Sequence, residues 1–418
     1  MKTPMGSTDM KKISGNPFSG LTIADMLLLA MCIVLLFQSS LQKVSPLFSY
    51  SDETAVLCLG LYSILHRIDQ KRAPLKTGIL VLSGIFVGIG LLGNLFSRVP
   101  DNIFPIAVDL FTCIKYPLVI VFGCDVLKSK RKLTDCLVVI GKALLLVMAA
   151  AFFASQIIDM GMTGDIRMGM ASFCFVFPHQ TFLVWFSASL LFMFIATEQS
   201  VFWIGLDLFL MATTLRAKAL GFIVVTVVLL LANRRGKGAL LTAAVIASVL
   251  AVGVSARQLA YYYSSDGFAR TEMTRACMRI AEDYYPFGSG FATFGSNITS
   301  TEDYYSVLYE RYGLSEIWGL TRGHASFVSD TFWPTVVGQF GWVGLICYVL
   351  LIIVANIYLF KNATNRRRTL LVLLGFAFFI ISSTSESAFF NPSAVILTMG
   401  EILGLTYVGS TAGPSDLS

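Results

Sequence analysis

The stretch Gly338-Gln-Phe-Gly-Trp-Val-Gly-Leu-Ile-Cys-Tyr-Val-Leu-Leu-Ile-Ile-Val-Ala355 lies inside a longer run, 331–360, that contains no charged residue. An α-helix needs about 20 predominantly apolar residues to cross the hydrocarbon core of a bilayer. This run is long enough and apolar enough to do so. It therefore predicts a transmembrane helix.

The composition of the whole chain points the same way. Of its 418 residues, 56% are hydrophobic and 13% are charged, and its mean hydropathy is +0.73. A soluble domain has about twice that share of charge. Twelve apolar runs of this kind occur, near 22–42, 52–66, 75–97, 104–126, 136–158, 180–197, 199–214, 217–233, 239–256, 331–360, 369–385 and 388–408. We therefore expect an all-α polytopic membrane protein with about 12 transmembrane helices and one large, partly helical extracytoplasmic loop.

Basic residues give the orientation. An even number of spans places both termini on one side, and that side holds 18 of the 31 Lys and Arg. They are Lys2, Lys11, Lys12, Arg67, Lys71, Arg72, Lys76, Lys128, Lys130, Arg131, Lys132, Arg234, Arg235, Lys237, Lys361, Arg366, Arg367 and Arg368. The positive-inside rule makes this side cytoplasmic. The net charge of +6 comes from these loops beside the membrane and does not indicate nucleic-acid binding.

This orientation divides the chain into five segments. They are a cytoplasmic N-terminal segment (1–21), a bundle of about nine transmembrane helices (22–256), an extracytoplasmic cap loop (257–330), the C-terminal transmembrane helices (331–408) and a cytoplasmic tail (409–418).

Two cations stand on the outer side, in the stretch Thr213-Thr-Leu-Arg-Ala-Lys-Ala-Leu-Gly221 between two apolar runs. Arg216 and Lys218 in this position predict an anionic substrate at the outer face of the membrane. The cap loop has six arginines and no lysine, and the planar arginine fork binds phosphate oxygens bidentately. Ordinary salt bridges are the alternative, because the loop also holds nine carboxylates. Nine of the 15 tyrosines lie there too, suited either to the membrane interface or to stacking on sugars.

Charged residues also occur inside the predicted spans. Because a charge at bilayer depth is costly, Lys115 is expected to pair with Asp109 or Asp207. An ion pathway in a transporter is the alternative. The eight cysteines show no metal-binding spacing, and no metal or other cofactor is expected.

Several segments, in order, resemble the bacterial O-antigen and capsular polysaccharide polymerases of the Wzy type, within the O-antigen ligase and polymerase superfamily. The stretch Thr214–Gly221 resembles the signature T-x-R-[AS]-K. Arg167 with Phe177-Pro-His-Gln180 is similar to the family's R…GF-x-HPN segment. The other matches are Arg270 with Pro286-Phe-Gly-Ser-Gly-Phe-Ala-Thr-Phe294, His324 with Ser329-Asp330, Gly338–Gly344, Thr384-Ser-Glu-Ser387 and Asn391-Pro392.

The resemblance implies a metal-independent integral-membrane glycosyltransferase. Such an enzyme transfers a nascent glycan from undecaprenyl pyrophosphate to the non-reducing end of a lipid-linked repeat unit, at the periplasmic face of the inner membrane. Donor and acceptor are then both lipid-linked oligosaccharides in the bilayer, and a chain-length regulator is an optional partner. An O-antigen ligase that uses lipid A core as acceptor is the first alternative, and a flippase or transporter of lipid-linked oligosaccharide is the second.

This reaction needs cations for the departing pyrophosphate and a base for the acceptor hydroxyl. We expect Arg216 and Arg270 to hold the pyrophosphate and His324 to act as base or acceptor orienter, with Asp330 as the alternative base. The expected substrate-binding residues are Arg167, Lys218, His179, Arg275, Arg279, Arg322 and Glu386.

Overall fold

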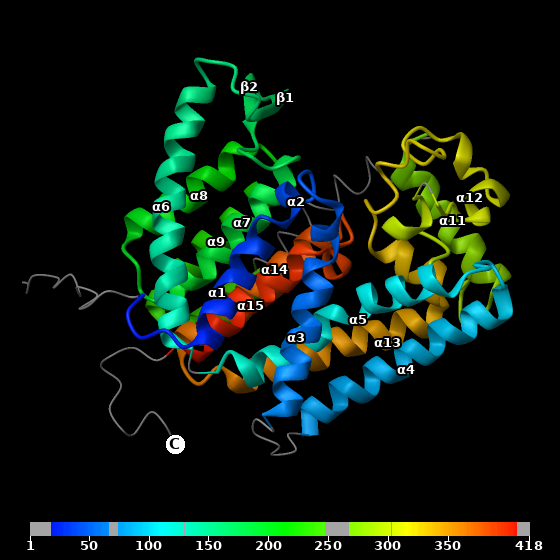
Figure 1. Cartoon of the computed structure of the whole chain (residues 1–418), viewed down its shortest axis with the longest axis horizontal. Coiled ribbons are helices and arrows are strands. Elements are labelled where there is room, and N and C mark those ends of the chain that lie inside the picture. Colours follow the sequence, from blue (N-terminus) through cyan, green and yellow to red (C-terminus); the bar gives the residue numbers. More distant parts are fainter. Residues whose placement is uncertain are drawn as a thin grey trace, which may run out of the picture.

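The computed structural model describes residues 18–66, 74–128, 130–236, 238–246, 267–301 and 303–407. These residues are largely helical (Figure 1). The longer helices are α1 (Ile23–Leu36), α3 (Ser51–Leu65), α4 (Pro74–Ser97), α5 (Ile103–Val126), α6 (Arg131–Ser155), α7 (Gln180–Ala196), α8 (Val201–Thr213), α9 (Ala217–Arg235), α11 (Ala269–Asp283), α13 (Trp333–Asn362), α14 (Arg366–Ser383) and α15 (Ser393–Thr406). This confirms the expected helical class.

Short elements connect these helices. The helical ones are α2 (Gln38–Leu41), α12 (Val307–Arg311) and the 3-10 turns η1 (Pro46–Tyr50), η2 (Asn297–Thr299), η3 (Leu314–Glu316) and η4 (Ala388–Phe390). A two-stranded antiparallel hairpin, β1 (Thr163–Arg167) and β2 (Met170–Phe173), forms the one sheet in the described segments. It stands beyond the end of α6 and carries Arg167 (Figure 1).

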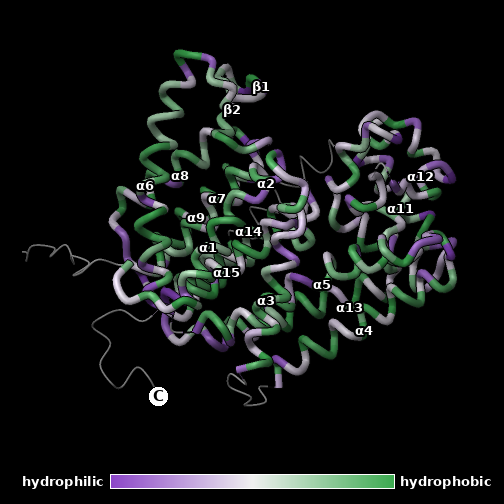
Figure 2. The backbone as a smooth tube through the Cα atoms, viewed as in Figure 1, coloured by the Kyte–Doolittle hydropathy of each residue, from purple (hydrophilic) through white to green (hydrophobic). Residues whose placement is uncertain are grey.

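Five of the described helices are long and apolar enough to cross a membrane: α4, α5, α6, α9 and α13. Large apolar side chains such as Leu57, Leu61 and Ile85 are exposed on the outside of the bundle, which suits contact with lipid. Figure 2 shows the same pattern, with hydrophobic residues along the long helices and hydrophilic ones at helix ends and in the α11–α12 lobe. The chain is therefore a helical membrane protein.

Eleven of the twelve expected apolar runs coincide with helices, and run 239–256 extends beyond the described residues. Some helices begin at a different residue from the apolar run that predicted them. Helix α6 begins at Arg131, before its apolar run, because basic residues also form helix well. Helix α15 begins only at Ser393, because Pro392 precedes it and residues 388–390 form a 3-10 turn.

The helices form two groups around a central element. Helix α15 has nearly every residue buried and packs against α7, α5 and α14. Helices α4, α5 and α13 lie side by side and extend away from this centre (Figure 1). The lobe formed by residues 267–301 and 303–330, here called the cap, sits on the ends of these three helices and contains α11 and α12.

A glycine-rich segment fastens the cap to the bundle. Gly290 N–H donates to the Gln339 carbonyl of α13 at 2.6 Å, and the Asn94 side chain of α4 bonds both backbone groups of Phe291 at 2.8 and 2.9 Å. Helix α13 breaks its helical geometry at Gly341, where φ is +62°. A Cβ on Gly288 would lie 2.4 Å from the Gly341 nitrogen. Two chain segments can approach this closely only because neither has a side chain.

Asp109 belongs to the same junction. Its carboxylate accepts hydrogen bonds from the Ala292 N–H at 2.7 Å and the Ser296 hydroxyl at 2.5 Å. The expected pairing of Asp109 or Asp207 with Lys115 is therefore wrong. Lys115 instead lies 2.5 Å from Asp52 of α3, because α3 and α5 pack together.

We predict that Gly288→Ala destabilises the protein. The added methyl must push α13 and the cap apart and also strains a left-handed backbone, at a combined cost of about 2 kcal/mol or more. The measurement is the midpoint of thermal unfolding of the purified protein in detergent. Gly84→Ala is the matched control, because Gly84 is helical and a Cβ there meets nothing within 4 Å. Equal midpoints for the two variants would contradict this account of the junction.

Candidate functional site

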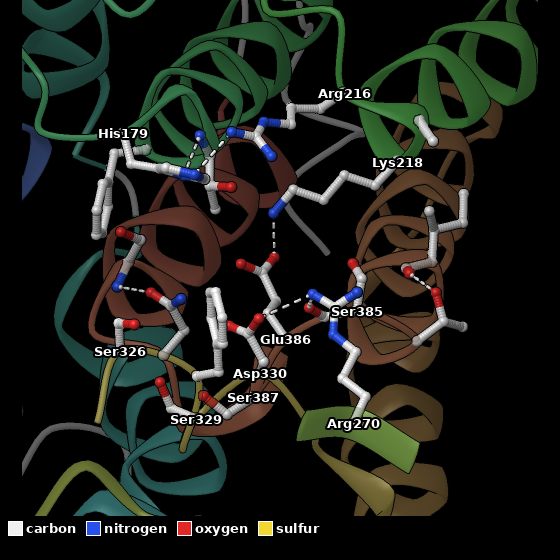
Figure 3. Close-up of a pocket in the computed structure, with 18 of the residues that line it drawn as sticks. His179, Arg216, Lys218, Arg270, Ser326, Ser329, Asp330, Ser385, Glu386 and Ser387 are labelled. Atoms are coloured by element: carbon white, nitrogen blue, oxygen red, sulfur yellow. Dashed lines mark hydrogen bonds and ion pairs between the residues drawn. The ribbon is translucent and has the colours of Figure 1, made fainter. Parts of the chain in front are cut away.

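A cavity of about 1210 Å³ lies where the cap meets the bundle. Its described walls come from separated parts of the chain: α2, the start of α7, the turn between α8 and α9, the start of α11, the end of the cap and the segment between α14 and α15. Figure 3 shows cations and carboxylates from these elements converging on one space. We refer to this cavity as the main pocket.

Arg216 and His179 form one wall of the main pocket. Each is the N-cap of a long helix, Arg216 of α9 and His179 of α7. An Arg216 Nη2 atom lies 2.7 Å from His179 Nε2 and donates to Gln180 Oε1 at 2.5 Å. The two helix N-termini add positive potential at the same place.

The His179 ring shows what this wall can bind. Its Nδ1 faces the Thr181 backbone N–H at 3.2 Å, while its Nε2 faces Arg216. A neutral imidazole has one acceptor nitrogen, so the ring can accept from only one of these two donors. Partial burial and the cations Arg216 and Lys218 lower the pKa of His179 to about 4, so the ring is neutral near pH 7. With Nδ1 accepting from Thr181, His179 Nε2 carries the proton, so an oxygen bound here could accept from both Arg216 and His179.

Lys218 and Glu386 meet deeper in the main pocket. The Lys218 ammonium donates to the Glu386 carboxylate, which also accepts from the Trp185 indole N–H at 3.1 Å. The ammonium lies 5.9 Å from the centre of the Trp185 ring, within the range of a cation–π contact. Both charged side chains are about nine-tenths buried. Pairing is what makes their burial possible.

The cap supplies a second ion pair. Arg270, at the start of α11, donates to Asp330 at 3.0 Å and to the Ser385 carbonyl at 3.0 Å. Burial raises the pKa of the Asp330 carboxyl, while Arg270 opposes this shift. A carboxylate with a raised pKa is a better proton acceptor than an exposed one.

One side of the main pocket is apolar. Leu220, Val224 and Val228 of α9 line it along one helix face, and Ile381 of α14 joins them. The spacing of four residues places the three α9 side chains in one stripe. The pocket thus runs from charged groups at the N-terminus of α9 to an apolar stripe further along the same helix.

Seven of the eleven expected site residues line the main pocket, and four do not. The seven are Arg167, His179, Arg216, Lys218, Arg270, Asp330 and Glu386. Of the others, Arg275 pairs with Glu272, Arg279 bonds the Tyr312 carbonyl, and Arg322 lines a smaller cavity with Ser300 and Thr301. His324 is exposed in a turn of the cap. It is not part of the described lining, so the structure does not place it for the role expected of it.

Two residues in or beside the pocket were not predicted from the sequence: Gln38, which lines it, and Trp185, which contacts Lys218 and Glu386. Trp185 lies in a continuous apolar helix, where nothing distinguishes it from a packing residue. Gln38 lies at the end of the first apolar run, is 3% exposed and lines the pocket. Its amide nitrogen donates to Asp52 at 2.6 Å, and Asp52 in turn holds Lys115. This buried pair therefore stands directly behind the pocket wall.

Comparisons with known proteins add no relative. No protein-family model and no curated protein matches this chain.

We predict that Lys115→Met lowers stability by about 3–5 kcal/mol, because it leaves the Asp52 charge buried without a cation beside it. The double variant Asp52→Asn/Lys115→Met removes both charges and should recover most of the loss. Unfolding of the purified protein by denaturant or heat measures both. If the double variant is no more stable than Lys115→Met, the ion pair is not the cause.

Proposed function

We propose that this protein is a polysaccharide polymerase. It transfers a nascent glycan from undecaprenyl pyrophosphate to the non-reducing end of a lipid-linked repeat unit, as the motif resemblance implies. The observation that carries the proposal is the two-part main pocket, in which four cations and two carboxylates lead into an apolar stripe on α9. A diphosphate joined to a long isoprenoid chain has matching parts. The product glycan would be an O-antigen, a capsule or another exopolysaccharide.

The proposed orientation has about twelve spans in the bacterial inner membrane, both termini in the cytoplasm and the pocket facing the periplasm. Helix direction supports it. Helix α9 begins at the pocket and ends in Arg234 and Arg235, and α13 begins beside Asp330 and ends near Lys361. The pocket therefore lies at the helix ends opposite these basic residues.

The residues fit one reaction step. The acceptor hydroxyl oxygen attacks the anomeric carbon of the donor sugar, and the bond from that carbon to the diphosphate oxygen breaks. Arg216 and Arg270 hold the departing diphosphate, with Lys218 and Arg167 nearby, and so stabilise its developing charge. Asp330 takes the hydroxyl proton. We assign the base to Asp330 in place of His324, because Asp330 lines the pocket.

We predict that Arg216→Ala lowers the rate of polymerisation by about ten- to a hundredfold, the effect of losing one charge-assisted hydrogen bond to phosphate. Purified protein in lipid nanodiscs, supplied with lipid-linked repeat units, gives the rate directly. Arg275→Ala is the matched control, since it removes a cap arginine outside the pocket lining.

The same variants in a deletion strain separate the alternatives. Polymerase function predicts that deletion leaves single repeat units on the lipid core, and that Arg275→Ala but not Arg216→Ala restores the ladder. A ladder that forms on the carrier lipid but never reaches lipid A would identify a ligase. Lipid-linked units trapped in the cytoplasmic leaflet would identify a flippase.

We also predict a distinctive acid limb in the pH profile of kcat/KM. A base works only when deprotonated. Because burial raises the pKa of Asp330, the enzyme should lose activity at a higher pH, as the pH is lowered, than it would with an exposed carboxyl as base. Arg270→Gln removes the cation that opposes the shift and should move the limb further upward, besides lowering the rate. Asp330→Asn should abolish most activity and the limb with it. An unchanged limb in Arg270→Gln would exclude Asp330 as the base.

A further inference from the structure

Trp318 occupies an unusual position in the cap. Its side chain is 75% exposed, yet it lines the main pocket. Between 311 and 330, all of which the structure describes, it is the one large apolar side chain left exposed. Its polar neighbours in the pocket lining include Ser326 and Ser329. An indole that is both exposed and part of the pocket lining is placed to contact a molecule bound in the pocket.

The cap holds this indole in place. Trp318 packs edge to face on Phe327, with 5.0 Å between ring centres. The Phe327 N–H donates to the Gly319 carbonyl at 3.0 Å, and the Leu320 N–H donates to the Ile317 carbonyl at 2.9 Å. A Cβ on Gly319 would lie 2.2 Å from the Phe327 ring, so only glycine permits this packing. The turn therefore presents a fixed aromatic surface.

We infer that Trp318 is a sugar-binding platform at the rim of the main pocket. The inference rests on the proposed function, and it adds where a sugar ring of the glycan substrate is held. One face of a pyranose ring presents C–H groups, which pack well on the negative face of an indole. The hydroxyls at the ring edge would meet the polar neighbours of Trp318.

Membrane anchoring is the rival role for an exposed tryptophan. Trp318 is the one large apolar side chain exposed between 311 and 330, so this part of the cap offers no apolar patch for insertion into lipid. Anchoring also depends on apolar character alone, while stacking needs a flat aromatic face. Leucine and phenylalanine at position 318 therefore distinguish the two roles.

The experiment compares Trp318→Phe, Trp318→Leu and Trp318→Ala with wild type in nanodiscs supplied with lipid-linked repeat units. Stacking predicts that Leu and Ala raise KM about five- to tenfold with little change in kcat, and that Phe stays near wild type. Tyr285→Leu, at an exposed aromatic outside the pocket lining, is the control and should behave as wild type. A Leu variant that equals wild type, or a Phe variant as weak as Ala, overturns the inference.

A second measurement separates this inference from the proposed reaction. Free repeat-unit oligosaccharide, with neither lipid nor diphosphate, is titrated against each variant by calorimetry. Binding that Trp318→Leu weakens supports the platform even if wild type fails to polymerise, in which case the proposed function alone is wrong. If wild type polymerises and all variants bind the oligosaccharide equally well, the inference about Trp318 is wrong and the proposed function is unaffected.

Discussion

The pairing of Lys218 with Glu386 ties the parts of this molecule together. Both side chains are about nine-tenths buried, and each charge offsets the cost of burying the other. Glu386 belongs to the segment between α14 and α15, which also accepts a hydrogen bond from Arg270 at Ser385 and donates one from Ser387 to the Ser329 carbonyl. The segment between α14 and α15 thus contacts Lys218 of the bundle, Arg270 of the cap and Ser329 near the end of the cap, all around the same pocket.

Each pocket cation that would meet a diphosphate already has a protein acceptor. Lys218 donates to Glu386, Arg270 to Asp330 and Arg216 to Gln180. A diphosphate must compete with these acceptors for the cations. The pocket therefore binds it less tightly than it would if the cations had no acceptors in the protein. An enzyme gains rate only from interactions that strengthen in the transition state, and tight binding of the leaving group would slow release. Internal pairing therefore suits the proposed reaction.

The helices, and the cations Arg216 and Lys218 at one end of the pocket, could be predicted from the sequence, for different reasons. Apolar runs report membrane helices directly, and Arg216 and Lys218 stood out because cations between such runs need an explanation. The partner of Lys115 could not be predicted, because hydropathy does not show that α3 packs on α5 and brings Asp52 to it. Trp185 and the α9 stripe were missed because an apolar residue in an apolar helix carries no separate signal.

The motifs that resemble the polymerase family fall into two groups, one that lines the pocket and one that attaches the cap to the bundle. The stretch 214–221 and the segment 384–387 line the pocket, while 286–294 and 338–344 join the cap to α4 and α13 through close glycine contacts. A polymerase and a ligase with the same lipid donor need the same cation site and the same cap attachment. Their difference must lie where the acceptor enters. Under the proposed function, the rim around Trp318 and Phe327 would make the acceptor choice, and the arginines would not.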